Sequence, residues 1–132
     1  MNSKTDLLAY AQNRHPLGDL QGPDSRPIYR ILLFEHPNKE RIYGAGTRSG
    51  FPDMECSMEA GFYYDLDDAI RAMNENICDI HENFYDAGFI LCQFPGLYES
   101  CGPEGRMYFV WDEEKKGFFQ KEEPEIFKHI AL

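Results

Sequence analysis

One amphipathic helical segment lies in the middle of this chain, between segments that have the composition of strands. When the residues of 65–82 and the two that follow are turned by about 100° each around a helix axis, the apolar side chains gather on one side. This apolar stripe consists of Leu66, Ala69, Ile70, Met73, Ile77, Ile80 and Phe84. A lone helix must bury such a stripe against another element, so the pattern predicts a helix packed on a sheet. Asp65 is expected to cap this helix.

The apolar runs on either side of this segment predict the strands of the sheet. Residues 27–35, PIYRILLFE, are apolar on both faces, as expected of a central strand. Further strands are expected at residues 41–46, 62–64, 85–94, 107–112 and 117–122. The EEKK connection at 113–116 predicts a hairpin, whereas 47–61 is expected to be a loop. The predicted class is α+β, with a single mainly antiparallel sheet of about 4–6 strands and one central amphipathic helix packed on it.

Short helices are expected at both ends of the chain. Ser3 and Asp6 form a capping pattern that predicts a helix over residues 4–13, and Pro124 precedes a second short helix at 125–132. At 132 residues the chain has the length of a single domain. Within it we expect an α+β core at 27–132, preceded at 1–26 by the helix and a Pro/Gly-rich arm.

Acidic residues are concentrated in the middle of the chain. The net charge is −10, and residues 53–114 alone carry 15 acidic and 2 basic side chains, a net charge of −13. Such a field repels nucleic acid and anionic membranes and attracts basic proteins. The predicted partner is therefore a basic protein surface, without direct nucleic-acid or membrane binding.

The sequence contains no apolar run near the roughly 20 residues of a membrane span, and its first residues do not resemble a signal peptide. We expect a cytoplasmic protein with no cofactor. Its cysteines are expected to be free thiols: Cys56, Cys78, Cys92 and Cys101.

The polar side of the central helical segment is the first candidate site. On the same projection the side opposite the apolar stripe carries Asp68, Arg71, Glu75, Asp79 and Glu82. Carboxylates at i,i+4 repel one another, which suggests selection for more than solubility. We interpret this row as a contact for a basic partner, and the alternative is a merely solvated face.

Aromatic residues beside acidic ones form the second candidate site. Trp111 precedes Asp112-Glu113-Glu114, and Tyr98 lies in a Gly/Pro-rich loop. Trp and Tyr are frequent anchors at interfaces, and their rings attract cations. We expect Trp111 and Tyr98 to anchor a basic segment, with the 53–59 loop also in contact.

Three other readings remain open. Cys78 and His81, one turn apart, are a possible pair of zinc ligands, although no second pair completes four. Cys101, in the Gly/Pro loop, is the candidate nucleophile of a small Cys/His-dependent enzyme. A structural module that self-assembles by exchanging residues 1–26 is the third.

Residues 62–127 resemble a loose group of small acidic bacterial proteins of unknown function, many of them carried by phages and other mobile elements. The resemblance rests on FYYDLDDAI, NICDIHE, YDAGFILCQ, PGLY, MYFVWDEEKKGFF and EEPE. It implies an accessory role such as inhibiting or regulating a host protein, of anti-defence or immunity type, and supplies no catalytic residues. The leading prediction is a non-catalytic acidic binding module for a basic, nucleic-acid-handling protein.

Overall fold

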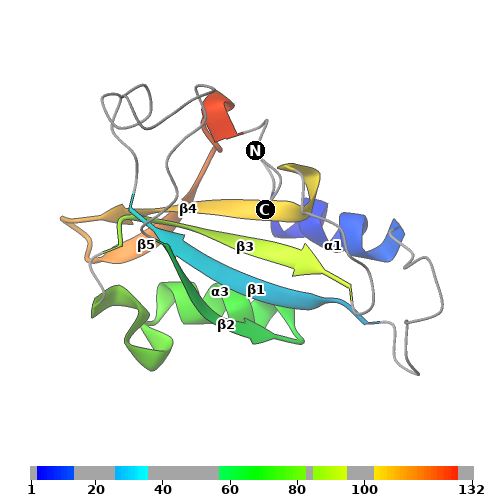
Figure 1. Ribbon diagram of the computed structural model, residues 1–132, viewed down its shortest axis with the longest axis horizontal. Helices are drawn as coiled ribbons and strands as arrows, with labels where there is room; N and C mark the ends of the chain where they lie inside the picture. Colours follow the sequence, from blue (N-terminus) through cyan, green and yellow to red (C-terminus); the bar gives the residue numbers. More distant parts are fainter. Residues whose placement is uncertain (1–2, 14–25, 36–56, 83–84, 95–102, 128–132) are drawn as a thin grey trace.

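The computed structural model of the chain describes residues 3–13, 26–35, 57–82, 85–94 and 103–127 (Figure 1). Its elements follow in the order α1 (Lys4–Asn13), β1 (Ile28–Phe34), β2 (Ser57–Tyr63), α3 (Leu66–Asn74), η1 (Ile77–Glu82), β3 (Ala87–Gln93), η2 (Pro103–Gly105), β4 (Arg106–Asp112), β5 (Gly117–Lys121) and η3 (Glu125–Phe127), where η marks a 3-10 helix. None of the helices within these ranges is long and apolar enough to cross a membrane.

The five strands form one sheet in the order β2-β1-β3-β4-β5, and every neighbouring pair is antiparallel. The predicted α+β class with a single antiparallel sheet is therefore confirmed. β1 has a partner on each side, as its two apolar faces indicated. Its register against β3 runs from Ile28 opposite Gln93 to Phe34 opposite Ala87. The strand predicted at 41–46 lies outside the described residues.

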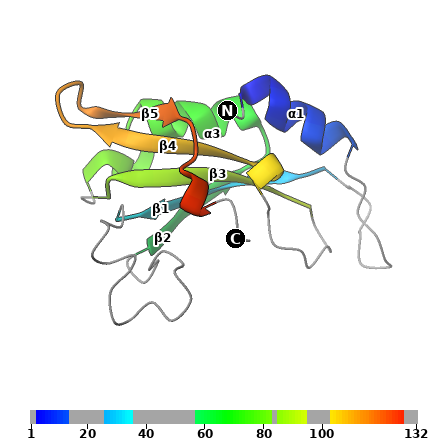
Figure 2. The ribbon, with the colours of Figure 1, turned by 90° about the horizontal axis from the view of Figure 1, so that it is seen from above.

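Both faces of the sheet are covered. Along β1, Ile31 and Leu33 belong to the core between α3 and the sheet, whereas Leu32 and Phe34 belong to a second core on the other face. Figure 1 shows α3 below the sheet and the η3 turn above it, and Figure 2 shows α1 beside one end. Phe127 of η3 is buried in the second core. Of the C-terminal helix predicted at 125–132, the described part is this single turn.

Helix α3 begins as its sequence predicts and ends earlier. The side chain of Asp65 accepts a hydrogen bond from the backbone N–H of Asp67 at 2.8 Å, which makes it the N-cap. The predicted helix over 65–82 is wrong beyond Asn74. Asn76 adopts a left-handed φ of 55°, and its Oδ1 accepts from the His81 backbone N–H at 2.7 Å. Asn tolerates this conformation and competes with helical hydrogen bonds, so the chain turns into η1.

Strand β2 corrects the expectation of a loop over 47–61, because the strand already begins at Ser57. The pairing with β1 is irregular between Arg30 and Leu32, and Gly61 has a φ of 96°. Glycine adopts this conformation without the steric cost of a side chain. Glu59 bridges the strands by pairing with Arg30 at 2.5 Å.

Close packing between α3 and the sheet requires Gly88 of β3. A Cβ atom at this position would lie 2.9 Å from Leu33 Cδ2, 3.1 Å from Met73 Cε and 3.2 Å from the Leu32 carbonyl oxygen. A side chain there would force the Leu33 and Met73 side chains to move, so glycine at this position lets them pack closely against β3.

Tyr29 predicts a loss of stability in alkali. Burial beneath the helix layer raises the pKa of Tyr29 to about 12, with Cys92 and Asp65 adding smaller contributions. An unfolded tyrosine ionises near pH ~10, so above that pH the unfolded state binds fewer protons and stability falls as pH rises. Below pH ~10 the contribution is complete and constant. Tyr29→Phe should flatten the decline in unfolding free energy measured in urea between about pH 9 and 12. An unchanged alkaline slope would contradict this assignment.

Candidate functional site

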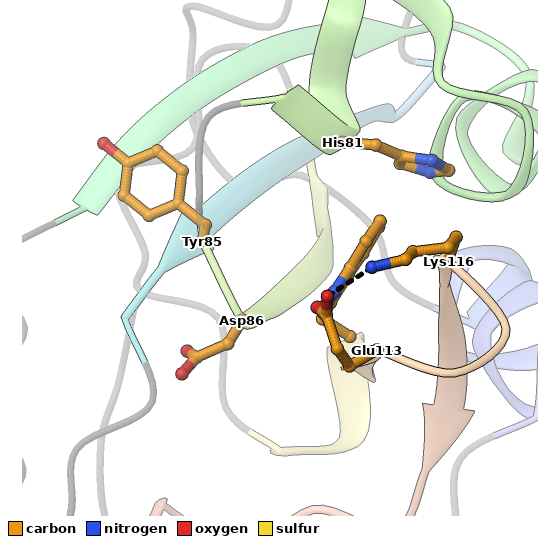
Figure 3. A pocket seen from close by; sticks show the side chains of 6 residues that line it. His81, Tyr85, Asp86, Glu113 and Lys116 are labelled. Carbon is orange, nitrogen blue, oxygen red and sulfur yellow. Dashed lines mark hydrogen bonds and ion pairs between the residues drawn. The ribbon is translucent and has the colours of Figure 1, made fainter.

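A pocket of about 350 Å³ opens between η1 and the β4–β5 hairpin (Figure 3). It is lined by His81, Tyr85, Asp86, Trp111, Glu113 and Lys116. These residues come from three separate parts of the chain, which the pairing of β3 with β4 and of β4 with β5 brings together. Pockets of this size commonly hold a small ligand or a protruding side chain.

The hairpin turn positions two of the lining residues. Asp112 Oδ1 accepts hydrogen bonds from the backbone N–H groups of Lys115 and Glu114, which lower the pKa of that carboxyl group. The Lys116 N–H donates to the Asp112 carbonyl at 2.8 Å, and Lys116 has a left-handed φ of 55°. The predicted four-residue connection is confirmed, and its hydrogen bonds fix the backbone from which Glu113 and Lys116 extend.

Glu113 is the polar centre of the pocket. Its Oε1 pairs with the Lys116 ammonium, and its Oε2 accepts from the Trp111 indole Nε1–H at 2.8 Å. The hydrogen bond from Lys116, followed by that from Trp111, lowers the pKa of the Glu113 carboxyl group. Glu113 is therefore a fixed anion at neutral pH, oriented by the indole ring.

His81 holds the aromatic side of the pocket in place. Its Nε2 lies 2.6 Å from the Met73 carbonyl oxygen, and because a carbonyl only accepts, Nε2 carries the proton. The imidazole centroid lies 5.1 Å from that of Trp111 in an edge-to-face arrangement. Phe118 packs against both rings, at 5.6 Å from His81 and 5.3 Å from Trp111. In Figure 3 His81 extends from η1 on the side of the pocket where Lys116 lies.

Tyr85 and Asp86 form the opposite wall, just before β3. The Asp86 carbonyl accepts from the Trp111 backbone N–H at 2.9 Å, which ties this segment to β4. Figure 3 shows both side chains directed away from Glu113 and Lys116, so they shape the mouth of the pocket rather than its centre. Its lining thus presents aromatic rings and carboxylates, the combination that favours cations.

The acidic residues predicted to bind a partner do not all lie on one continuous helix. Asp68 is exposed on α3, and Glu75 pairs with Arg71. Asp79 and Glu82 are exposed on η1, where the projection of a continuous helix is wrong. Trp111 lies in the pocket, whereas Tyr98 lies outside the described residues, as does most of the 53–59 loop.

The structure bears differently on the two alternative sites, the Cys101 nucleophile and the Cys78–His81 zinc pair. Cys101 and the side chain of Cys78 lie outside the described part of the chain. His81, considered as a zinc ligand, donates Nε2–H to a carbonyl and packs on Trp111. Within the described ranges, no three His, Cys, Asp or Glu side chains gather closely enough to hold a metal ion.

Sequence reasoning identified Trp111 and the acidic residues after it but missed the pocket. The WDEEKK sequence indicates that an indole and a carboxylate lie close together. It gives no sign that His81 and Tyr85 join them, because that requires the register of three strands. Comparisons of the chain with protein-family models, with curated proteins and with solved structures found no match.

Proposed function

We propose that this protein is a non-catalytic binding module whose pocket at the β4–β5 hairpin anchors a basic segment of a partner protein. The observation that carries the proposal is the Trp111–Glu113 pair, an indole ring hydrogen-bonded to a carboxylate inside a pocket. An aromatic face beside a fixed anion offers a cation both a ring and a counter-charge. Tryptophan is also one of the residues enriched among those that dominate interface energetics.

The surrounding charge supports a basic partner. Asp68, Asp79 and Glu82 are exposed, and the central part of the chain that contains them is strongly acidic. Glu75 adds little to this field at short range because Arg71 neutralises it. Such a field speeds association with a basic protein and weakens as salt screens it. In this proposal the field brings the partner close and the pocket holds it.

The class of partner follows from the same charge and from the resemblance of residues 62–127. A nucleic-acid-handling protein presents the basic surface that an acidic protein complements. We propose that the protein is a cytoplasmic accessory protein of a mobile element that inhibits or regulates such a host protein. This role depends on binding alone and uses no cofactor.

Glu113→Gln tests the proposal because it removes the pocket charge while keeping the size and an oxygen acceptor. We expect the wild-type protein to capture a basic protein from a lysate of the source cell at low salt. Against that partner, once purified, the variant should bind about tenfold more weakly or worse, the range lost with a charge-assisted hydrogen bond.

Glu114→Gln is the matched control, since Glu114 lies in the same turn and does not line the pocket. It makes the same change in net charge and should retain nearly wild-type affinity. Capture of no basic partner by the wild type, or equal affinity of both variants, would refute the proposal.

A further inference from the structure

We infer that the pocket selects a guanidinium group, which would displace Lys116 from its pairing with Glu113. The inference rests on the proposed function and names the chemistry of its central contact. It starts from the Lys116 ammonium, a cation of the pocket lining that pairs with Glu113.

The position of Lys116 is set by the hairpin. Its left-handed φ of 55° is uncommon for a residue with a side chain, and it directs Lys116 back across the turn. Figure 3 shows the ammonium facing the Glu113 carboxylate. The chain therefore supplies its own cation to the anion that a ligand would use.

This internal pair is easily exchanged. The side chains of Lys116 and Glu113 are 67% and 75% exposed, so water and salt screen their attraction. Lys116 has a flexible stem, and its neighbour Lys115 lies 5.1 Å from the centroid of the Phe119 ring. A ligand cation that also contacts Trp111 has an advantage over Lys116.

A guanidinium fits this arrangement better than a second ammonium. It is planar, so it can stack on an indole, and it presents paired donors to a carboxylate. Glu113 offers Oε1 as soon as Lys116 withdraws, and Oε2 remains fixed by the Trp111 N–H. The pocket volume of about 350 Å³ exceeds the need of one ammonium and accommodates an arginine side chain.

The test uses short capped peptides and the single tryptophan of the chain, Trp111. Its indole N–H gives one NMR resonance from inside the pocket, and its fluorescence gives a second signal. We expect acetyl-Gly-Arg-Gly-amide to shift that resonance saturably. The citrulline peptide, which has the same shape without the charge, should cause no shift, and the lysine peptide should bind more weakly than the arginine peptide.

Lys116→Met separates competition from general electrostatics. Removing the internal competitor should tighten arginine-peptide binding by about two- to fivefold, the range for an exposed ion pair. Lys115→Met changes the net charge equally but leaves the pocket lining intact, so it should tighten binding measurably less. An amide spectrum dispersed like that of the wild type establishes that each variant is folded.

Three results would overturn the inference: equal shifts with arginine and citrulline peptides, lysine binding as tightly as arginine, or equal effects of Lys116→Met and Lys115→Met. If Glu113→Gln still weakens binding to the partner protein, the proposed function stands and only the guanidinium selection fails. If Glu113→Gln has no effect on that partner, the proposed function fails whatever the peptides do.

Discussion

Replacing Glu123 with alanine is expected to lower the free energy of unfolding by about 3–5 kcal/mol, the range for breaking a buried ion pair. The Arg106 side chain is 0% exposed and that of Glu123 only 12%. Arg106 Nε and Nη2 donate to the two carboxylate oxygens at 2.6 and 3.0 Å, and Nη2 also donates to the Phe127 carbonyl at 2.7 Å. Glu123→Ala would remove the carboxylate that pairs with the buried Arg106 guanidinium.

Urea unfolding followed by Trp111 fluorescence measures this loss. Glu122→Ala is the control, because Glu122 is the exposed neighbour in the same segment, and it should stay within about 0.5 kcal/mol of the wild type. The double change Arg106→Met with Glu123→Leu should recover much of the stability, since an apolar pair needs no counter-charge. If Glu123→Ala and Glu122→Ala lowered the free energy of unfolding equally, the Arg106–Glu123 pair would not contribute as a buried ion pair.

Phe89→Ala is expected to be as costly, at about 3–5 kcal/mol, because it empties the centre of the second core. The Phe89 ring is fully buried, with centroids 5.4 Å from Phe34 and 5.3 Å from Tyr108. The Arg106 guanidinium lies 4.9 Å from its centroid. The substitution removes these contacts together and leaves a cavity that the stiff sheet cannot close.

Phe119→Ala provides the comparison on the same sheet, since Phe119 is 39% exposed and outside both cores. Its loss should cost less than about 1 kcal/mol, mainly the contact with the Lys115 ammonium. Thermal unfolding of both variants should separate them clearly. Similar midpoints would mean that the core around Phe89 contributes far less than its burial indicates.

Local sequence patterns were sufficient to predict where α1 and α3 begin. Helix α3 follows from its apolar stripe and from Asp65, and α1 begins where Ser3 and Asp6 exchange hydrogen bonds at 2.9 and 3.2 Å. The end of α3 was missed because the periodicity continues to Ile80, which is buried from η1 instead. The signal was Asn76, whose side chain serves the next turn rather than the helix.

The strand expected at 62–64 overlaps only the end of β2, and the first five residues of β2 were expected to be loop because their pattern is weak. Its sequence, SMEAGFY, includes residues with poor strand propensity, and a glycine interrupts the alternation. Pairing with the apolar β1 holds β2 in the sheet. The local sequence of β2 does not show which strand it will pair with. The pocket shares this limit, because Trp111 was recognised as an anchor but its contact with His81 depends on tertiary packing.

The strand order affects how the sheet can form while the chain is being synthesised. β1 lies between β2 and β3, and its Ile31 is paired with Ile90. As the chain leaves the ribosome, β1 and β2 can meet early, but two strands alone are only marginally stable. The other edge of β1, whose sequence is the apolar IYRILLF, cannot pair with β3 until β3 has been synthesised. During that interval the nascent chain exposes an aggregation-prone strand edge. Protection by a chaperone would be needed most just before β3 emerges.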